Sequence, residues 1–142
     1  MSKVGIVYWS GTGNTEKMSE LIEKGAAGKG ASVTRKKVGE VKAAELAAYD
    51  VIVLGSPSMG SEVIEEAEME PFFTELLPSL GGKKIGIFGS YGWGDGEWLR
   101  TWAGRVRGAG GRLMDDGLAV HETPDGDSEA ACLAWGEKLA VF

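Results

Sequence analysis

An apolar strand runs straight into a glycine-rich turn at residues 4–15, which read VGIVYWSGTGNT. The first half is β-branched or aromatic apart from one glycine, as a buried strand requires. The second half, residues 10–15, supplies two glycines, three hydroxyls and one amide just before an amphipathic stretch. At a helix N-terminus, converging N–H groups and the helix dipole attract an anion. These residues therefore predict a strand–turn–helix unit that holds a phosphate group.

Two other phosphate-binding sequences are excluded at named positions. A Walker A loop ends in Gly-Lys-Ser or Gly-Lys-Thr, and residues 10–15 contain no lysine. The dinucleotide fingerprint needs a third glycine three residues after the second, where this chain has Glu16. A plain helix N-cap, made by Ser10 or Thr12 without any ligand, stays open as an alternative.

Short β-branched runs alternate with amphipathic stretches along the rest of the chain. The pattern predicts strands at residues 4–9, 32–38, 51–56, 84–90 and 112–120, and helices at residues 15–28, 42–49, 70–77, 97–107 and 128–142. Residues 51–54 and 85–88 are continuously apolar, as central strands of a parallel sheet must be. We expect a single α/β domain over residues 1–142, with three layers and helices on both faces of a parallel sheet. Ligands of such sheets bind beyond the carboxyl ends of the strands.

Two more loops are expected at that edge of the sheet. Residues 56–62 read SPSMGSE, and Gly60 can adopt a positive φ there and switch between turn forms. Residues 90–96 read SYGWGDG, which sets Trp93 among glycines with few neighbours of its own. A flat ligand would give this indole a packing partner. The alternative is an indole folded back over the next helix near Trp98 and Trp102.

Composition narrows the classes of function. The 142 residues include 21 acidic and 15 basic ones, and the net charge of -6 repels a nucleic-acid backbone. One cysteine, Cys132, and one histidine, His121, exclude a disulfide scaffold and a zinc module. No apolar run approaches the roughly 20 residues that span a bilayer. The N-terminus lacks the pattern of a signal peptide, so we expect a cytoplasmic protein.

Four features receive packing roles rather than chemical ones. We expect Cys132 to be a core thiol on the apolar face of the last helix, and His121 to lie at the surface. Trp9, at the end of the first strand, is expected to pack in the core. The basic run at residues 35–37 is expected to protect an edge strand rather than to bind a 2′-phosphate.

The three loops together resemble the flavodoxin family, in particular its short-chain members from anaerobic bacteria. The resemblance rests on YWSGTGNTE at residues 8–16, MGSE at residues 59–62 and GSYGWGDG at residues 89–96, and it extends over nearly the whole chain. It implies a doubly wound five-stranded sheet in the order 2-1-3-4-5, with FMN at the switch point. It also implies that Met59 and Trp93 lie on opposite faces of the isoalloxazine ring, and that the backbone of residues 59–62 faces its N5, O4 and N3 edge.

The resemblance and the loop chemistry together give a set of expected FMN-binding residues. The phosphate would bind to the first loop, and the ring to the other two. The set consists of Ser10, Gly11, Thr12, Gly13, Asn14, Thr15, Pro57, Ser58, Met59, Gly60, Ser61, Glu62, Ser90, Tyr91, Gly92, Trp93 and Gly94.

The implied function is that of a low-potential one-electron carrier, not an enzyme, whose FMN cycles between semiquinone and hydroquinone. A flavodoxin-like quinone or azo reductase using NAD(P)H is the main alternative, although this chain leaves little length for a nicotinamide pocket. A response-regulator receiver would need an aspartate where the third strand ends, and Ser56 stands there. A flavin-binding module for regulation or storage would differ in redox behaviour rather than in sequence. We expect a monomer.

Two sequence features predict how the flavin potentials would be set. If the peptide between Met59 and Gly60 flips on reduction, its carbonyl can accept a hydrogen bond from N5–H. Residues 57–80 contain no basic residue, so negative charge is expected around the flavin edge, where it would also steer reductases and electron-accepting enzymes with basic faces. A solvated acidic helix face is the alternative. The acidic residues are Glu62, Glu65, Glu66, Glu68, Glu70, Glu75, Asp95 and Glu97.

Overall fold

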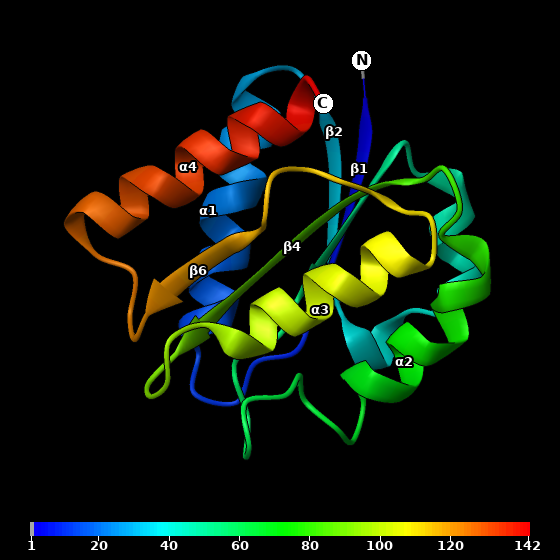
Figure 1. Ribbon diagram of the computed structural model, residues 1–142. Helices are drawn as coiled ribbons and strands as arrows, with labels where there is room; N and C mark the ends of the chain where they lie inside the picture. The colour runs from blue at the N-terminus through cyan, green and yellow to red at the C-terminus, as the bar shows by residue number, and fades with distance from the viewer. Residues whose placement is uncertain (1) are drawn as a thin grey trace.

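β-branched apolar runs form the middle of a parallel sheet in the computed structural model, which describes residues 2–142 (Figure 1). The strands are β1 (Lys3–Tyr8), β2 (Ser32–Lys37), β3 (Val51–Gly55), β4 (Lys84–Tyr91), β5 (Arg112–Leu113) and β6 (Leu118–His121). Their order is β2-β1-β3-β4-β5, with β6 also paired to β4, and every pairing is parallel. The predicted α/β class and the order 2-1-3-4-5 are confirmed.

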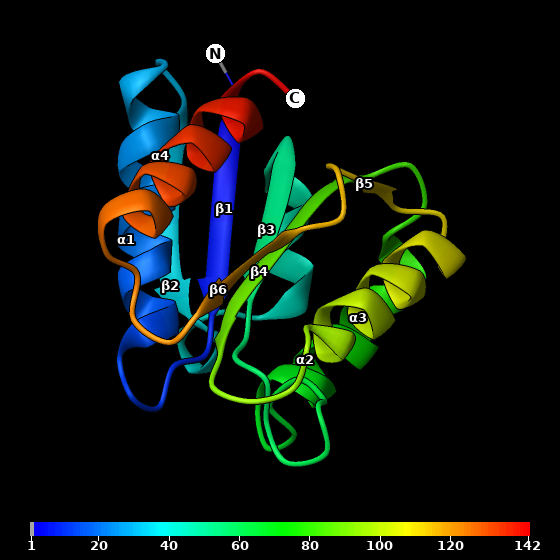
Figure 2. The same cartoon turned by 60° about the vertical axis from the view of Figure 1, so that its left-hand side comes forward.

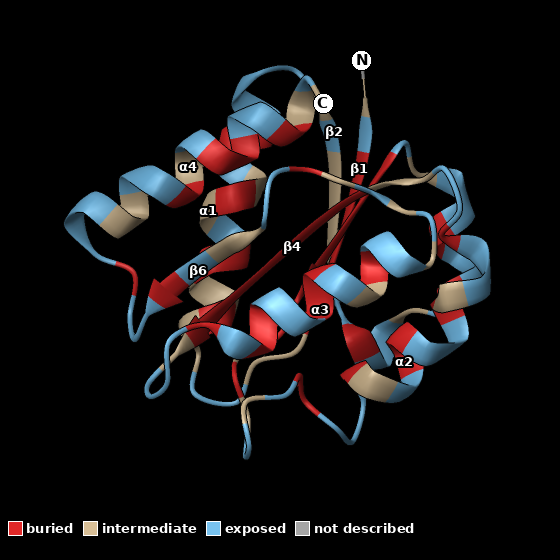
Figure 3. Cartoon of the chain, in the orientation of Figure 1, coloured by how far each residue is buried: buried red, intermediate tan, exposed pale blue. Residues whose placement is uncertain are grey.

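Four α-helices cover the two faces of this sheet. They are α1 (Asn14–Gly28), α2 (Met69–Leu76), α3 (Glu97–Gly108) and α4 (Gly126–Ala140). Figure 2 shows α1 and α4 together on one face and α2 and α3 on the other. The buried side chains accordingly form two cores, and Figure 3 shows that the helices bury the sides that face the sheet. No helix of the described residues is both long and apolar enough to cross a bilayer.

The predicted α-helix at residues 42–49 is wrong. Two short 3-10 helices occupy this connection, η1 (Val38–Glu40) and η2 (Ala43–Ala48), and a third, η3 (Leu77–Ser79), follows α2. The backbone of Lys42 and of Tyr49 is extended on either side of η2. Tyr49 must leave the helix because its ring packs directly over Gly5 of β1, where a Cβ would lie 2.8 Å from the ring.

The strand predicted at residues 112–120 is interrupted. β5 and β6 pair with successive parts of β4, and the chain between them bends at Asp115 (φ 46°) and Gly117 (φ 92°). The Asp115 carboxylate accepts hydrogen bonds from the N–H of Gly117, the indole of Trp135 and the ammonium of Lys138. These three donors hold the Asp115 backbone in a left-handed conformation that residues other than glycine rarely adopt.

The carboxyl ends of the strands meet at one edge of the sheet. From β1 the chain turns outward to β2 on one side, whereas β3 lies on the other, so the strand order reverses between β1 and β3. A crevice beyond this switch point is the expected ligand site of a doubly wound sheet. The segments that leave β1, β3, β4 and β6 all begin there.

Candidate functional site

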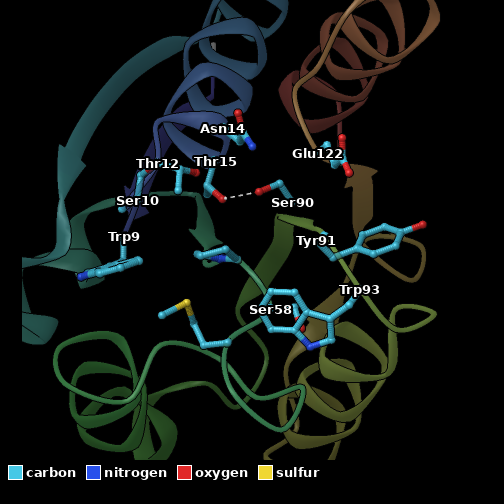
Figure 4. A pocket seen from close by; sticks show the side chains of 14 residues that line it. Trp9, Ser10, Thr12, Asn14, Thr15, Ser58, Ser90, Tyr91, Trp93 and Glu122 are labelled. Atoms are coloured by element: carbon cyan, nitrogen blue, oxygen red, sulfur yellow. Dashed lines mark hydrogen bonds between the residues drawn. The ribbon is translucent and has the colours of Figure 1, made fainter.

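A cavity of about 280 Å³ lies at this edge of the sheet, next to the switch point. The lining side chains come from the segments that follow β1, β3, β4 and β6 (Figure 4). They belong to Trp9, Ser10, Gly11, Thr12, Asn14, Thr15, Pro57, Ser58, Met59, Ser90, Tyr91, Gly92, Trp93 and Glu122. The fold therefore brings the three predicted loops to one place. Five residues of the expected set do not line it: Gly13, Gly60, Ser61, Glu62 and Gly94.

The loop at residues 10–15 wraps the start of α1. The Ser10 hydroxyl accepts hydrogen bonds from the N–H groups of Gly13 and Glu16, both at 3.2 Å, and so caps the first turn from outside the helix, although the N-cap residue is Gly13 rather than Ser10 or Thr12. The N–H of Lys17 donates to the Gly13 carbonyl. Of the first N–H groups of the helix, those of Asn14 and Thr15 are left as donors for an anion at the positive end of the dipole. Capping and anion binding are thus compatible here.

Hydrogen bonds fasten this loop to the rest of the sheet edge. The hydroxyls of Thr15 and Ser90, both buried, lie 3.2 Å apart and join α1 to β4 (Figure 4). The Thr123 hydroxyl donates to the side-chain oxygen of Asn14 at 2.9 Å, and the N–H of Ser58 donates to the Ser90 carbonyl at 3.0 Å. The start of α1, the end of β4 and the segments after β3 and β6 are therefore linked beside the cavity.

The second loop makes a tight turn with few contacts. Met59 and Val63 exchange two backbone hydrogen bonds of 2.9 and 3.0 Å, which close a turn over residues 60–62. Gly60 has φ 49° and Glu62 has φ 56°, so the turn needs two left-handed residues. No atom would lie within 4 Å of a Cβ at Gly60. The turn is therefore held at its base and free at its tip.

The Ser58 hydroxyl in the second loop is buried and has no hydrogen-bond partner among the described residues. Ser58 is 4% exposed and lines the cavity. Leaving a buried hydroxyl unpaired costs about 1–3 kcal/mol. A polar ligand atom in the cavity would remove that cost.

The third loop presents an open indole. Trp93 is 53% exposed and lines the cavity, whereas Trp98 and Trp102 are buried in the core beneath α3. The alternative in which Trp93 folds back over those two residues is therefore wrong. The ring stacked on Trp98 is instead Tyr91, at a centroid distance of 5.5 Å. Gly94 (φ 77°) contacts the Glu62 carboxylate and leaves no room for a side chain there.

Three of the acidic residues expected around the flavin edge have structural partners. Glu65 is buried, and its carboxylate accepts the N–H groups of Ala67, Glu68 and Met69 at the start of α2. Glu70 makes a two-pronged ion pair with Arg105 of α3, with both distances 2.7 Å. A helix start and a helix–helix contact use these two carboxylates, and Arg105 balances the charge of Glu70.

The ion pairs also shift carboxyl pKa values. The hydrogen bond from Arg105 lowers the pKa of Glu70 below its usual range, against a smaller opposing effect of burial. Asp95, the third paired acid, is fully exposed, and the hydrogen bond from Arg100 lowers its pKa. Glu66, Glu68, Glu75 and Glu97 are exposed, so acidic side chains do remain near the second and third loops.

Two cavity residues were not in the expected set. Trp9 packs against the core as expected, but it also lines the cavity, and its ring lies on Gly11, where a Cβ would be 2.9 Å away. Glu122 (φ 60°) follows β6 at the same edge, and its N–H donates to the Tyr91 carbonyl. Residue 122 comes just after the strand predicted at residues 112–120. This position is the sequence signal that indicates it, since ligands bind where strands end.

The residues that line the cavity fit a ligand with an anionic end and a flat apolar end. Helix N–H groups and hydroxyls surround one end, and Met59, Tyr91 and Trp93 surround the other. Ser58, whose hydroxyl has no hydrogen-bond partner among the described residues, also lines the cavity. A flavin that carries a phosphate has this distribution of charge and surface.

Comparison with known proteins identifies the family. A sequence model described as flavodoxin matches residues 6–135. The chain belongs to the flavodoxin family. It is 47% identical to the flavodoxin of Clostridium beijerinckii, over 95% of this chain and 97% of that protein. It is also 47% identical to the flavodoxin of Megasphaera elsdenii, over 96% and 98%.

Solved structures agree with this assignment. The solution structure of two-electron reduced Megasphaera elsdenii flavodoxin has a TM-score of 0.89 at 46% identity, covering 98% of this chain and 99% of that one. The structure of a flavodoxin from the domain Archaea has a TM-score of 0.88 at 31% identity, over 98% and 96%. Flavodoxins are flavin-containing electron-transfer proteins rather than enzymes and act with redox partners. The expected family, its short-chain type and the function of an electron carrier are confirmed, and nothing favours the reductase alternative.

Proposed function

We propose that the cavity binds one FMN and that the protein carries single electrons at low potential, alternating between the one-electron-reduced and fully reduced states of the cofactor. FMN supplies reversible one-electron chemistry when it is bound. The observation that carries the proposal is the pairing of a helix start, which has free N–H donors, with an exposed indole across the same cavity. Membership of the flavodoxin family supports it.

The loop at residues 10–15 supports FMN rather than riboflavin as the ligand, because only FMN carries a phosphate. The N–H groups of Asn14 and Thr15 and the hydroxyl of Thr12 would bind the phosphate oxygens, since all three residues line the cavity at the start of α1. The loop contains no basic residue, so hydrogen bonds and the helix dipole would hold the charge. Gly13 (φ 98°) would serve by shaping this loop rather than by contact.

The ring end would hold the flat part of the cofactor between Met59 and Trp93. The Ser58 hydroxyl would donate to or accept from the ligand in the middle of the cavity. Gly60, Ser61, Glu62 and Gly94 lie outside the cavity lining, so we assign them to the outer edge of the ring, where backbone groups of the turn can reach it.

The turn also offers a way to favour the reduced states. If the peptide that joins Met59 to Gly60 rotates, the Met59 carbonyl would exchange its hydrogen bond from the Val63 N–H for one from the N5–H of the reduced cofactor. Gly60 permits this because it has no Cβ and tolerates a positive φ. A hydrogen bond of about 1 kcal/mol corresponds to roughly 40 mV for a one-electron couple. In Gly60→Ala we expect the first reduction potential to fall by about that amount, and an unchanged potential would contradict the role of the turn.

Negative charge near the ring would lower the second potential and guide partners. Two like charges about 10 Å apart repel by roughly 1.7 kcal/mol at an effective dielectric constant of 20. With Glu65, Glu70 and Asp95 engaged elsewhere, the exposed acids are Glu66, Glu68, Glu75, Glu97 and Glu122. Reductases and electron acceptors with basic faces are the partners that such a surface would attract. We propose that the protein works as a monomer in the cytoplasm, where its free thiol Cys132 would stay reduced.

Ligand choice tests this function directly. Apoprotein titrated with FMN, riboflavin and FAD, with flavin fluorescence as the signal, should bind FMN most tightly. Riboflavin should bind at least tenfold more weakly, because it lacks the phosphate. Equal affinity for FMN and riboflavin would contradict a phosphate site at residues 10–15. Steady oxidation of NADPH by the loaded protein would support the reductase instead.

A further inference from the structure

Behind the phosphate loop, the hydroxyl of Tyr8 links two elements of the fold. Tyr8 is the last residue of β1 and is 3% exposed. Its hydroxyl donates to Glu16 Oε2 at 2.8 Å and accepts from Arg35 Nη1 at 3.1 Å. Burial, and then the hydrogen bond to Glu16, raise the pKa of Tyr8. The phenol therefore stays protonated and can fill both roles at neutral pH.

Arg35 reaches this point from the edge strand β2. Its side chain retains 23% of its accessible surface and is turned inward, where Nε donates to Glu23 at 2.9 Å. Nη1 also donates to the hydroxyl of Ser19 at 3.3 Å, and the guanidinium lies 5.6 Å from the centre of the Tyr8 ring. Arg35 is thus the basic member of the run at residues 35–37 that faces α1, and its role goes beyond the expected protection of an edge.

Both routes from Arg35 end on one residue in the first turn of α1. Through Tyr8, the guanidinium reaches the carboxylate of Glu16. Through Ser19, whose hydroxyl donates to the Glu16 carbonyl at 2.6 Å, it reaches the backbone of the same residue. The N–H of Glu16 in turn donates to Ser10 in the phosphate loop. Glu16 is therefore fixed at its carboxylate, its carbonyl and its N–H.

The position of Glu16 matters for an anion. The carboxylate belongs to the same helix turn as Asn14 and Thr15, which line the cavity. Without a partner, a negative charge in this turn would repel a bound phosphate and could swing toward it. The hydrogen bond from Tyr8 instead holds the carboxylate at the end of β1, while Arg35, whose charge is paired with Glu23, fixes the Tyr8 hydroxyl from the other side.

We propose that Arg35 is a positioning residue for phosphate recognition, which it supports from behind the loop by holding Glu16 through Tyr8 and Ser19. This inference rests on the proposed binding of FMN. It gives the phosphate loop a basic residue that the loop itself lacks, supplied by a strand 20 residues later in the chain. The ring end of the cavity takes no part in the arrangement.

The test compares ligands with and without a phosphate. We would measure the dissociation constants of FMN and riboflavin for the wild-type apoprotein, Arg35→Met and Tyr8→Phe. In Arg35→Met, we expect the FMN constant to rise about tenfold, or 1.4 kcal/mol, and the riboflavin constant to change less than twofold. Tyr8→Phe, which cuts one of the two routes, should shift the FMN constant in the same direction by a smaller factor.

Lys36→Met is the matched control. It removes the same charge one residue along β2, but Lys36 is exposed and belongs to the other face of the strand, where it lines a small crevice with Val7 and Tyr49. Its ratio of FMN to riboflavin affinity should equal that of the wild type. A loss of FMN preference in Lys36→Met equal to that in Arg35→Met would reduce the effect to net charge and overturn the proposal.

The remaining outcomes separate this inference from the proposed function. If the wild type prefers FMN and Arg35→Met keeps the same preference, the role of Arg35 is refuted and FMN binding stands. If Arg35→Met weakens FMN and riboflavin equally, the residue acts on the fold alone, and the proposal is again refuted. If the wild type itself shows no preference for FMN, the proposed phosphate site fails first, and the role of Arg35 falls with it.

Discussion

The loop at residues 10–15 and the turn at residues 59–63 border the same cavity, but the protein holds them in different ways. The loop is fixed by Ser10, by the contact of Thr15 with Ser90, and by Asn14 with Thr123. The turn is closed by one pair of backbone hydrogen bonds, and nothing would lie within 4 Å of a Cβ at its tip. The loop is thus held by side-chain hydrogen bonds to two other segments, and the turn by its own base and by the contact of the Glu62 carboxylate with Gly94.

This difference matches the two tasks of an electron carrier. A phosphate needs donors that are already in place, since preformed sites spend less free energy on ordering. A ring that changes its charge and protonation needs neighbours that can adjust. Two helix contacts support the opposite faces of the sheet, the packing of α1 on α4 and the ion pair between Glu70 of α2 and Arg105 of α3.

The largest effect on stability is expected where α1, which begins at the loop of residues 10–15, packs on α4. Gly136 of α4 lies directly on the Ile22 carbonyl of α1, so a methyl group there has no room. We expect Gly136→Ala to lower the free energy of unfolding by about 3 kcal/mol, measured by urea denaturation of the apoprotein. Gly104→Ala on α3, where no atom lies within 4 Å, is the control and should stabilise by up to about 1 kcal/mol. Equal midpoints for the two variants would contradict this description of the helix contact.

Trp93 offers the matching test of the open end. Because the indole is half exposed and outside the core, Trp93→Ala should weaken FMN and riboflavin alike, by about 30-fold, through loss of ring stacking. The apoprotein should keep its stability within about 0.5 kcal/mol. Val141→Ala, at an exposed position far along the chain, serves as the control and should change neither quantity. A large loss of apoprotein stability in Trp93→Ala would show that the indole belongs to the fold rather than to the site.

Replacing Ser10 should change both the stability of the apoprotein and the binding of FMN, whereas replacing Trp93 should change binding alone. Its hydroxyl accepts two N–H groups, so Ser10→Ala should cost about 1 kcal/mol of apoprotein stability, as loss of a helix cap does. The same variant should bind FMN more weakly with less effect on riboflavin. Ser79→Ala, at an exposed position in η3 outside the cavity lining, is the control for removal of a hydroxyl. Unchanged stability in Ser10→Ala would mean that the loop is not held from within.

Acid should weaken the ion pair between Glu70 and Arg105, with a small loss of stability. The pKa of Glu70 is lowered in the folded protein, so the ion pair with Arg105 contributes stability above the ordinary carboxyl pKa and loses it as the pH falls below that value. The pair is about one-third exposed, and solvent screening keeps its contribution within about 1 kcal/mol. The difference in stability between the wild type and Glu70→Gln should therefore shrink between pH 7 and pH 3. A constant difference across that range would assign the effect to packing.

The sequence was sufficient for most of the fold because the regular elements carry strong local patterns. The runs at residues 51–54 and 85–88 are buried central strands, and Cys132 lies in the core, where burial raises the pKa of its thiol to about 11. The break between β5 and β6 could not be predicted, because it depends on hydrogen bonds from Trp135 and Lys138 of α4 to Asp115. The 3-10 helix at residues 43–48 likewise depends on Tyr49 covering Gly5.

The site was predictable in its loops but not in its charges. Glycines and hydroxyls after strands have a local meaning, so three loops could be expected at one edge. Whether a glutamate faces solvent depends on a partner far along the chain, such as Arg105 for Glu70. Arg35 was assigned to edge protection for the same reason, because its hydrogen bond to Tyr8 spans 27 residues.

The central claim is that one FMN works here in separate one-electron steps, and an anaerobic titration of the FMN-loaded protein with dithionite tests it most directly. Visible absorption should show a long-wavelength band of the one-electron-reduced cofactor that rises during the first equivalent and decays during the second. Direct passage from oxidised to fully reduced flavin, without that band, would contradict the claim and indicate two-electron chemistry in this cavity.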